Sequence, residues 1–346
     1  MNVLSLFDGM ACGMLAMQKA GIEVKKYVAY EIDKYAVQTS AHNFPMIEQK
    51  GDVFQADFAE YFGFDFLIGG SPCTYWSIAQ KNNRETEASG MGWELFSQYV
   101  RALHEAKPKF FVYENNKSMS TAIRESINKA FGFEAICINS ALVSAQNRNR
   151  LYWVGKRNDD GTYSKVNIEQ PEDLGVLLKD VLESGAAWQD KSYAYTTRCQ
   201  GAIPHDTLGK HRHTMVAEPV SVAIFNYPHG FNDGGVKYNK TSTLTANGSW
   251  QSNNFVIERQ DGKSYQVYEI KGGKITIKGK QYPIKLADGF YILRKLTVRE
   301  CMRLQTVPEW YEFPVSDSQA YKMLGNGWTV DVIAHILKGL GDATMT

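Results

Sequence analysis

Short apolar runs separated by helical patterns fill the first 155 residues of the chain. The four runs of β type are Val3–Phe7, Tyr27–Tyr30, Asp65–Gly69 and Phe110–Tyr113. Helical spacing is found between them, at Cys12–Ala20 and around Trp93–Ala106. Such alternation is typical of a parallel sheet that is buried on both faces. We therefore predict an α/β fold with a doubly wound, mostly parallel sheet, whose ligands bind at the carboxyl edge of the strands.

The pattern changes after about residue 155. Residues 156–170 are polar and predict a linker, and the chain is then rich in Thr, Ser, Asn, Gly and Tyr as far as about residue 290. Within this region, Lys271–Ile284 alternates lysine with β-branched residues, which predicts a hairpin unable to form a large core. Helical spacing returns from Arg294, and a last helix is expected from about Thr329.

Composition and charge narrow the class of protein only slightly. Hydrophobic residues make up 44% and charged residues 22% of the 346 positions, which excludes a disordered chain. The net charge of +1 indicates no particular partner. Residues 271–303 carry nine Lys or Arg against two acidic residues, but such a basic stretch is also typical of an ordinary solvated surface. The five cysteines form no CxxC pair, so we expect no metal site and a reducing compartment. With no signal peptide or long apolar stretch, a cytoplasmic location is expected.

The Gly69-Gly70-Ser71-Pro72-Cys73 segment directly follows the third apolar run. Glycines permit a tight turn and proline has a fixed φ angle, so Cys73 is expected at the ligand-binding edge of the sheet. A cysteine at this edge can act as a nucleophile in its thiolate form, which needs nearby positive charge or dipoles. A lone cysteine is also often a small buried hydrophobic residue, and the segment alone leaves both interpretations open.

Two further polar motifs belong to this half of the chain. Glu114 follows Phe110–Tyr113, where a partly desolvated carboxylate can bind a substrate or simply cap a turn. In the segment QNRNR, alternation places Gln146, Arg148 and Arg150 on one face of an extended strand. Two arginines on one face suit a phosphate or a planar anion, although an exposed strand face has the same pattern.

The loop after the first strand contains the glycine-rich segment FDGMACG, residues 7–13. It lacks the GxGxxG spacing of a dinucleotide site, which argues against a nicotinamide-dependent oxidoreductase. Glu31 ends the second apolar run, where an acid can accept hydrogen bonds from both hydroxyls of a ribose, and Asp52 follows Gly51 further along. Together these residues predict a site for a nucleoside-type cofactor.

In their order, these motifs resemble the DNA (cytosine-5) methyltransferases almost from end to end. The matching segments are FDGMACG, Glu31, Gly51-Asp52, Pro72-Cys73, Glu114-Asn115, QNRNR, RKLTVRECMRLQTVP at 294–308 and GNGWTV at 325–330. The first and last of them are most similar to the branch that contains the eukaryotic de novo enzymes. The size of the chain is closer to that of a bacterial or phage enzyme. Asn116 stands where the family usually has valine, and Ala11 and Cys12 replace glycines, which puts details of cofactor packing in question.

The resemblance implies a reaction in which Cys73 adds to carbon 6 of a cytosine flipped out of double-stranded DNA. Glu114 would hold the N3 edge and the exocyclic amine, with Arg148 and Arg150 beside it as the other catalytic residues. S-adenosylmethionine would supply the methyl group for carbon 5 and leave as S-adenosylhomocysteine. The residues implied to bind it are Phe7, Asp8, Gly9, Met10, Cys12, Gly13, Glu31, Ile32, Asp52, Val53, Pro72, Asn326 and Trp328.

The resemblance also implies a division into domains. Residues 1–155 and 320–346 would form the catalytic, S-adenosylmethionine-binding domain, and 156–319 a smaller, β-rich target-recognition domain that includes 294–313. Thr74–Gly92 would be a mobile loop that closes on DNA, and the protein would be a monomer. The residues expected to contact DNA are Ser77, Gln80, Lys81, Lys271, Lys274, Lys278 and Lys280, with Arg198, Gln200 and Arg212 as further candidates.

Two alternatives share this fold. A tRNA cytosine-5 methyltransferase would use the same Pro-Cys and Glu-Asn chemistry, but the chain lacks the Cys-Phe-Thr element expected of that family. A catalytically inactive DNA-binding regulator would be indicated by the loss of Cys73, Glu114 or Arg150, and all three residues are present.

Overall fold

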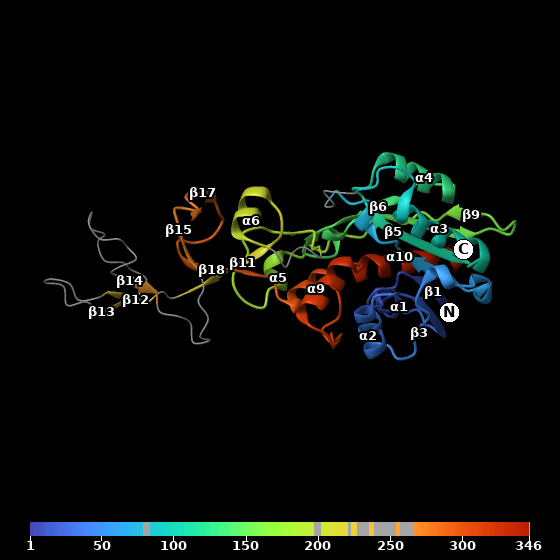
Figure 1. Ribbon diagram of the computed structural model, residues 1–346, viewed down its shortest axis with the longest axis horizontal. Coiled ribbons are helices and arrows are strands. Elements are labelled where there is room, and N and C mark those ends of the chain that lie inside the picture. The colour runs from blue at the N-terminus through green and yellow to red at the C-terminus, as the bar shows by residue number, and fades with distance from the viewer. Residues whose placement is uncertain are drawn as a thin grey trace. The chain divides into compact units, whose positions relative to one another are not determined.

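The computed structural model describes residues 1–78, 84–196, 202–220 and 266–345, together with three short strands at 223–226, 235–238 and 254–256 (Figure 1). The chain forms two compact units. Unit 1 comprises Met1–Leu177, Ala194–Gln200 and Val298–Thr346, and unit 2 comprises Leu178–Tyr193 and Gly201–Thr297. Among the described residues, no helix has the length and apolar character needed to cross a membrane.

The predicted domain boundaries differ from the boundaries of the units. The polar segment after residue 155 belongs to unit 1, because strand β9 (Tyr163–Lys165) pairs with strand β8 (Asn149–Arg157) and extends the sheet. Helix α8 (Val298–Leu304) also belongs to unit 1. The carbonyl oxygen of Leu304 accepts hydrogen bonds from the Ser144 Oγ (2.6 Å) and the Gln146 Nε2 (3.1 Å), both in unit 1.

An eight-stranded sheet forms the centre of unit 1. Its strand order is β3-β2-β1-β4-β5-β8-β6, and β9 pairs with β8. The other strands are β1 (Asn2–Leu6), β2 (Lys26–Tyr30), β3 (Glu48–Gln49), β4 (Phe66–Gly69), β5 (Phe110–Asn116) and β6 (Ile136–Asn139). Strands β3, β2, β1, β4 and β5 are parallel, whereas β8 runs antiparallel to β5, β6 and β9. This arrangement confirms the predicted α/β fold.

Helices pack against both faces of this sheet (Figure 1). On one face, Leu67 of β4 belongs to the large core that includes Tyr99 and Phe131, which lie in α3 and α4. The adjacent Ile68 points to the opposite face, where its Cδ1 lies against Gly13 of α1. The helices of unit 1 are α1 (Cys12–Ala20), α2 (Lys34–Asn43), α3 (Gly90–Ala106), α4 (Thr121–Phe131), α8, α9 (Asp317–Asn326) and α10 (Val330–Met345). Short 3₁₀ turns are η1 (Val53–Gln55), η2 (Phe58–Tyr61), η3 (Cys73–Tyr75) and η4 (Ser140–Leu142).

Unit 2 is rich in strands. Its five-stranded antiparallel sheet has the order β11-β18-β15-β16-β17, formed by Met215–Pro219, Gly289–Lys295, Val267–Lys271, Lys274–Ile277 and Lys280–Pro283. A smaller antiparallel sheet has the order β13-β12-β14, formed by Gly235–Tyr238, Ala223–Asn226 and Asn254–Val256. The remaining elements are α5 (Leu178–Val181), β10 (Ser192–Tyr193) and α6 (Pro204–Lys210).

The predicted hairpin at Lys271–Ile284 is present, but the expectation that it forms no sizeable core is wrong. Ile275 pairs with Ile270 on one side and with Tyr282 on the other, and all three side chains are buried in one hydrophobic cluster. Helix α6 adds to this cluster, since the Tyr282 hydroxyl lies 2.8 Å from the Nδ1 of His205. Alternation along three neighbouring strands thus gives one continuous apolar face, which a single strand cannot provide.

Candidate active site

A cavity of about 310 Å³ lies at the carboxyl edge of the parallel strands in unit 1. Its walls come from the loops after β1, β2 and β4, from β5 and β8, and from the end of α9 with the segment that follows it. The predicted catalytic and cofactor-binding residues that line it are Phe7, Asp8, Gly9, Met10, Cys12, Glu31, Pro72, Cys73, Glu114, Arg148, Arg150, Asn326 and Trp328. One cavity therefore brings together motifs that lie as far apart as the two ends of the chain.

Cys73 begins turn η3 immediately after β4 and lines the cavity as a partly buried free thiol. Gly70 allows this turn to approach β5, because a Cβ atom at this position would lie 2.7 Å from the carbonyl oxygen of Glu114. The Oγ of Ser71 lies 2.6 Å from the hydroxyl of Tyr113. The Nδ2 of Asn115 donates to the carbonyl oxygen of Ser71 (3.1 Å). These contacts hold the turn that carries Cys73 against the adjacent strand.

The carboxylate of Glu114 is held between two donors. The Nε of Arg150 lies 3.0 Å from Oε1, and the Nε1 of Trp328 donates to Oε2 at 3.0 Å. The ion pair is largely buried, since the Glu114 and Arg150 side chains are 12% and 15% exposed. Glu114 lies within β5 and pairs with Tyr152, so the strand does not end before it as predicted. Strand β5 continues because antiparallel β8 provides hydrogen-bonding partners along this stretch.

Arg148 lies between β7 (Gln146–Asn147) and β8, and its contacts are with the protein backbone. Its buried guanidinium donates to three carbonyl oxygens, those of Tyr195 (2.9 Å), Gly325 (3.2 Å) and Gly327 (2.9 Å). Burial, with a smaller contribution from the neighbouring charge of Arg150, lowers the pKa of Arg148 to about 10. Arg148 lines the cavity, but its donors are directed at the backbone of unit 1.

The expectation that Gln146, Arg148 and Arg150 offer one face to a phosphate is therefore wrong. The Nε2 of Gln146 donates to the carbonyl oxygen of Leu304, and its Oε1 accepts from the backbone N–H of Tyr195 (2.7 Å). Because Gln146 and Arg148 both bond to buried backbone groups, Arg150 alone of the three reaches the Glu114 carboxylate.

The loops after β1 and β2 bring three carboxylates to the cavity, those of Asp8, Glu31 and Asp33. The Oδ1 of Asp8 accepts hydrogen bonds from the Ser5 Oγ and the Tyr27 hydroxyl, each at 2.6 Å. Its Oδ2 is buried and has no hydrogen-bond partner among the described residues, and burial raises the pKa of Asp8 to about 6. Glu31 accepts from the backbone N–H of Gly9 at 2.8 Å, which ties the first loop to the end of β2. The orphan oxygen of Asp8 can accept a hydrogen bond from a cationic ligand.

Four predicted cofactor residues do not line this cavity, namely Gly13, Ile32, Asp52 and Val53. Gly13 allows α1 to pack closely on the sheet, because a Cβ there would lie 2.4 Å from the Ile68 Cδ1. The Oδ1 of Asp52 accepts from the backbone N–H of Phe54 and caps η1, in which Val53 is buried. Ile32 is 77% exposed. Their roles toward a cofactor stay predictions.

The departures from the family pattern lie at two places in the site. Asn116 is buried beside the nucleophile turn, where its Oδ1 accepts from the Ser118 Oγ (2.7 Å) and its Nδ2 lies 3.5 Å from the carbonyl oxygen of Cys73. Cys12 lies under the last motif, since a Cβ at Gly327 would be 3.2 Å from its Sγ. Burial raises the pKa of Cys12 to about 12, so this thiol stays neutral.

The sequence did not indicate several other residues of the cavity wall. They are Ser5, Asp33, Ala36, Lys322 and Met323. The Nζ of Lys322 lies 2.6 Å from the Oδ2 of Asp33, and these residues are 289 positions apart. Asp33 could have been found from the sequence, because it shares a loop with the predicted site residue Glu31. Lys322 could not, because its partner Asp33 is distant in the sequence.

The family model for C-5 cytosine-specific DNA methylases matches residues 1–342. The chain belongs to this family. It is a DNA (cytosine-5) methyltransferase, which confirms the enzyme class expected from its motifs. Within the part of the chain that the structure describes, no group of three or more His, Cys, Asp or Glu side chains is arranged to hold a metal ion.

Relatives match the methyltransferase over nearly its whole length. The type II methyltransferase M.FnuDI of Fusobacterium nucleatum is 28% identical over 98% of this chain and 93% of its own length. The type II methyltransferase M.HhaI of Haemophilus parahaemolyticus is 25% identical, covering 99% and 95%. The solved structure of the Entamoeba histolytica methyltransferase EhMeth has a TM-score of 0.60 at 13% identity, covering 99% of this chain and 98% of that one, and shows the shared fold.

The segment after Cys73 is anchored at both of its described ends. Trp76 is fully buried, and its Nε1 donates to the Glu85 carboxylate at 3.0 Å. Arg84 donates to the carbonyl oxygens of Trp76 (3.1 Å) and Ser118 (2.7 Å). The backbone N–H of Ser77 donates to the carbonyl oxygen of Cys73. The predicted DNA contacts Gln80 and Lys81 lie outside the described residues, as do Arg198 and Gln200.

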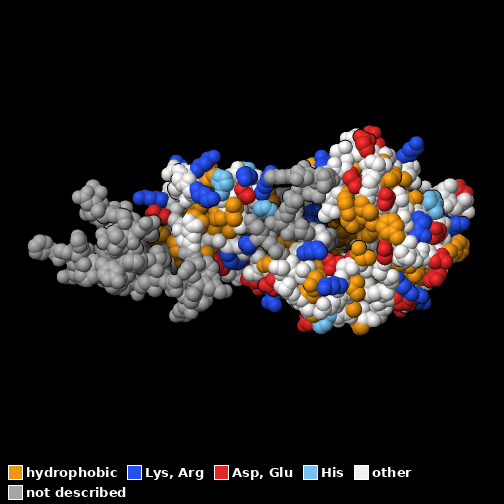
Figure 2. Space-filling view, in the orientation of Figure 1, with side chains coloured by type: hydrophobic (Ala, Val, Ile, Leu, Met, Phe, Trp, Pro, Cys, Tyr) orange, Lys and Arg blue, Asp and Glu red, His pale blue; other side chains and the backbone are white. Residues whose placement is uncertain are grey.

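The lysines predicted to contact DNA are exposed in unit 2. Lys271 and Lys274 pair across β15 and β16, and Lys278 occupies the turn that follows. The Nζ of Lys280 lies 5.4 Å from the ring centre of Tyr282. Figure 2 shows basic side chains over the part of unit 2 that carries these strands. Arg212 is also exposed. The strands thus have one buried apolar face and one face with exposed lysines.

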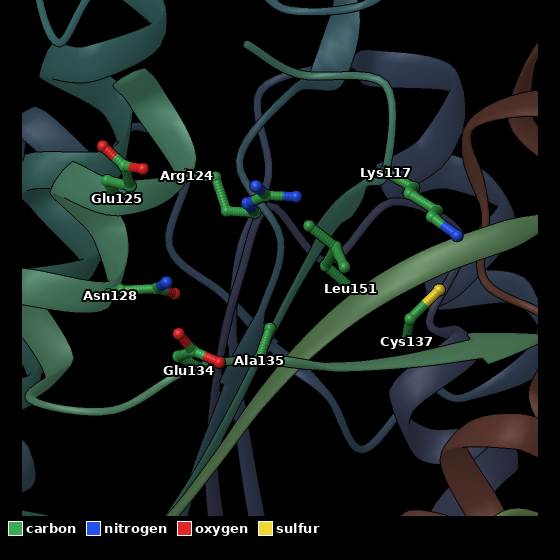
Figure 3. A pocket seen from close by; sticks show the side chains of 8 residues that line it. All are labelled: Lys117, Arg124, Glu125, Asn128, Glu134, Ala135, Cys137 and Leu151. Carbon is green, nitrogen blue, oxygen red and sulfur yellow. The ribbon is translucent and has the colours of Figure 1, made fainter. Parts of the chain in front are cut away.

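A second cavity of about 370 Å³ lies between α4, β6 and β8 in unit 1. Its lining residues are Lys117, Arg124, Glu125, Asn128, Glu134, Ala135, Cys137 and Leu151. Figure 3 shows Arg124 and Lys117 along one side, with the Cys137 thiol below Lys117. None of the predicted catalytic or cofactor residues lines this cavity, so Cys137 provides a natural comparison for Cys73.

Proposed function

We propose that the methyltransferase modifies a cytosine that has been flipped out of duplex DNA, with Cys73 as its nucleophile and S-adenosylmethionine as its methyl donor. The observation that carries this proposal is the shared cavity. Cys73, Glu114 and Arg150 line the same cavity as Asp8 and Glu31. A base-activating group and an anionic site for a cationic nucleoside are thereby placed within one small space. Carbons 5 and 6 of cytosine are inaccessible in a duplex, so the base must leave the stack.

Cys73 activates the base by covalent addition. Its thiolate forms a bond to carbon 6, and the ring electrons shift so that carbon 5 becomes an enamine-type nucleophile. Glu114 holds the N3 edge and the exocyclic amine as charge develops on the ring. Arg150, bound to Glu114, fixes that carboxylate and adds positive charge nearby. Splitting the reaction in this way replaces one difficult step by easier ones.

The bound S-adenosylmethionine supplies an electrophilic methyl group on a sulfonium centre. After carbon 5 has been methylated, its proton passes to a water molecule acting as base, the electrons of that C–H bond form the double bond between carbons 5 and 6, and the bond between carbon 6 and Cys73 breaks. The double bond of the ring is restored and Cys73 is released as a thiolate. The side chains of Asp8 and Glu31 orient the donor, and the wall formed by Pro72 and Trp328 limits access of water.

The residues present fit a donor of this kind. The unpartnered buried Oδ2 of Asp8 suits the ammonium group, and the Glu31 carboxylate suits ribose hydroxyls. Phe7 lines the cavity beside them and offers an aromatic surface for the adenine. We place Ile32, Asp52 and Val53 around the adenine, because their segments follow β2 and β3 at the same sheet edge.

Binding of the donor is expected to weaken as the pH falls below 6. Asp8 has a pKa of about 6 in the free protein, and a bound ammonium group favours its ionised form, so binding at pH 5 requires the loss of about one proton. Calorimetry with S-adenosylhomocysteine should therefore show affinity about tenfold lower at pH 5 than at pH 7. Asp8→Asn should flatten this dependence, whereas Asp33→Asn, in the same cavity, should retain it. A pH dependence that survives Asp8→Asn would assign it to another group.

The exposed lysines of β15, β16 and the following turn are proposed to follow the DNA backbone. Each lysine that neutralises a phosphate adds about 0.9 to the slope of log affinity against log salt concentration. Lys271→Gln combined with Lys274→Gln should reduce this slope by about 1–2 and weaken binding to all duplexes alike. The methylated motif should stay the same, because phosphate contacts carry no base information.

The matched control for this pair changes two exposed lysines of unit 1, Lys25 and Lys165, to glutamine. The control keeps the same net charge as the test variant. An equal loss of slope in both variants would mean that overall charge, not this face, determines binding. A changed methylation motif in the test variant would show that Lys271 or Lys274 reads bases.

Bisulfite sequencing of DNA from cells that express the chain tests the proposed function as a whole. We expect complete protection of one cytosine within a short recurring sequence and none in cells expressing Cys73→Ala. Methylation of tRNA with unmodified DNA would instead favour the RNA enzyme that shares this chemistry. Methylation in both cell types would contradict the role of Cys73.

A further inference from the structure

Trp328 connects two parts of the site that the reaction uses for different purposes. It belongs to the segment Asn326–Trp328, which lines the cavity and is assigned to the donor. Its indole N–H, however, is directed at the acid that receives the cytosine, since Nε1 donates to the Glu114 Oε2 at 3.0 Å. These residues are 214 positions apart, and neither motif alone indicates the contact.

The backbone around Trp328 is firmly braced. Arg148 donates to the carbonyl oxygens of Gly325 and Gly327. Gln305 adds a hydrogen bond from its Nε2 to the carbonyl oxygen of Leu324 (2.7 Å), and its Oε1 accepts from the Thr329 Oγ1 (2.8 Å). The segment is thus held on both sides of the indole, and the position of the N–H is determined by the fold.

A carboxylate that has one donor can still rotate about its last side-chain torsion, because this torsion has a broad energy profile. Glu114 has a donor on each oxygen, Arg150 on Oε1 and Trp328 on Oε2. Two donors at separate positions define the plane of the carboxylate. Each oxygen keeps a second lone pair, so one can accept from the exocyclic amine of cytosine and the other can share a proton with N3.

We propose that Trp328 is a positioning residue that fixes the carboxylate plane of Glu114 for cytosine. This inference rests on the proposed role of Glu114 toward the base. It also has a thermodynamic consequence, because a donor that contacts the indole acts through this hydrogen bond on the carboxylate that receives the base. Binding of the donor product and of DNA should then favour each other by the same factor in both directions.

The test removes the indole N–H and keeps the aromatic packing. In Trp328→Phe, kcat should fall about tenfold, the size expected for losing a hydrogen bond to a charged group. The dissociation constant for S-adenosylhomocysteine should change by less than about twofold. Replacing the indole with benzothiophene, which has nearly the same shape and no N–H, should give the same loss and guards against a folding defect in the phenylalanine variant.

A double-mutant cycle with Glu114→Gln decides whether the indole acts through Glu114. Once Glu114→Gln is present, removal of the indole N–H should lower kcat by no more than about twofold. An equal tenfold loss in both backgrounds would overturn the proposal, as would an unchanged kcat in the benzothiophene variant. If Glu114→Gln alone leaves methyl transfer intact, the assigned role of Glu114 fails, which is a separate result.

Trp310 provides the control for changing a tryptophan. It lies in unit 1, is 53% exposed and packs edge-on against Phe44. Trp310→Phe should leave kcat and the affinity for S-adenosylhomocysteine unchanged. Coupling between the two ligands is measured as the ratio of DNA dissociation constants with and without S-adenosylhomocysteine. Trp328→Phe should bring this ratio closer to one, and an unchanged ratio would contradict the coupling.

Discussion

Cys73→Ala is expected to lower the rate of methyl transfer by at least about 10³-fold, because the variant cannot form the bond to carbon 6 that makes carbon 5 nucleophilic. The protein should stay folded, since Cys73 is only partly buried and alanine fits the first position of η3. Binding of S-adenosylhomocysteine should be retained, because Asp8 and Glu31 are unchanged. The measurement is the transfer of labelled methyl groups to duplex DNA under single-turnover conditions.

Cys137→Ala is the matched control for this experiment. Cys137 is also a free and partly buried cysteine, but it lines the second cavity (Figure 3). Its replacement should leave the transfer rate unchanged. Transfer by Cys73→Ala within tenfold of the unmodified protein would contradict the assignment of the nucleophile. A trapped complex between the protein and DNA containing 5-fluorocytosine should form with the unmodified protein and with Cys137→Ala, but not with Cys73→Ala.

The second large effect is expected on stability and comes from Arg148. Arg148→Met removes the buried donor of the Tyr195 and Gly325 carbonyl oxygens and leaves that of Gly327 with only a 3.4 Å hydrogen bond from the Gln305 Nε2. The free energy of unfolding of unit 1 should fall by about 3–5 kcal/mol, since each unsatisfied buried group costs about 1–3 kcal/mol. Urea unfolding followed by tryptophan fluorescence measures this change.

Arg150→Met provides the contrast. Arg150 contacts Glu114 and the neighbouring carbonyl oxygen of Asn149, and Glu114 keeps its Trp328 donor in the variant, so the loss of Arg150 should cost less stability, about 1–3 kcal/mol, while methyl transfer is severely reduced. The two arginines of one motif would then have different roles: Arg148 would stabilise the fold, and Arg150 would fix the carboxylate that receives the base. Equal stability of the two variants would refute this division.

The strands that carry the site could be predicted because they are buried on both faces. Each of Val3–Phe7, Tyr27–Tyr30 and Asp65–Gly69 is a continuous apolar run followed by a polar or glycine-rich turn, and the observed strands lie within one residue of these bounds. Burial leaves no choice of face, so composition alone identifies such strands. Helix α1 begins and ends at the predicted residues, Cys12 and Ala20. Its end could be predicted because Gly21 follows, and glycine readily adopts the left-handed conformation that ends a helix.

The partners of the polar side chains could not be predicted in the same way. Alternation indicates that Gln146, Arg148 and Arg150 share a face, but it does not show what that face meets. The acceptors of Arg148 come from Tyr195 and from the last motif, both remote in the sequence. The link between Trp328 and Glu114 was missed for the same reason. Long-range hydrogen bonds depend on how the strands and loops assemble, and no local pattern records them.

The bonds of Glu114 and Arg148 to residues 325–328 also bear on when a newly made chain is expected to become active. Cys73 and Glu114 are synthesised long before Gly325 and Trp328, so the growing chain first contains the proposed nucleophile without the donors and acceptors that complete the site. A polypeptide that ends before residue 325 keeps Arg148 without two of its acceptors and Glu114 without its indole donor. We therefore expect methylation only after residues 325–328 have been translated, and fragments that end before them should be inactive.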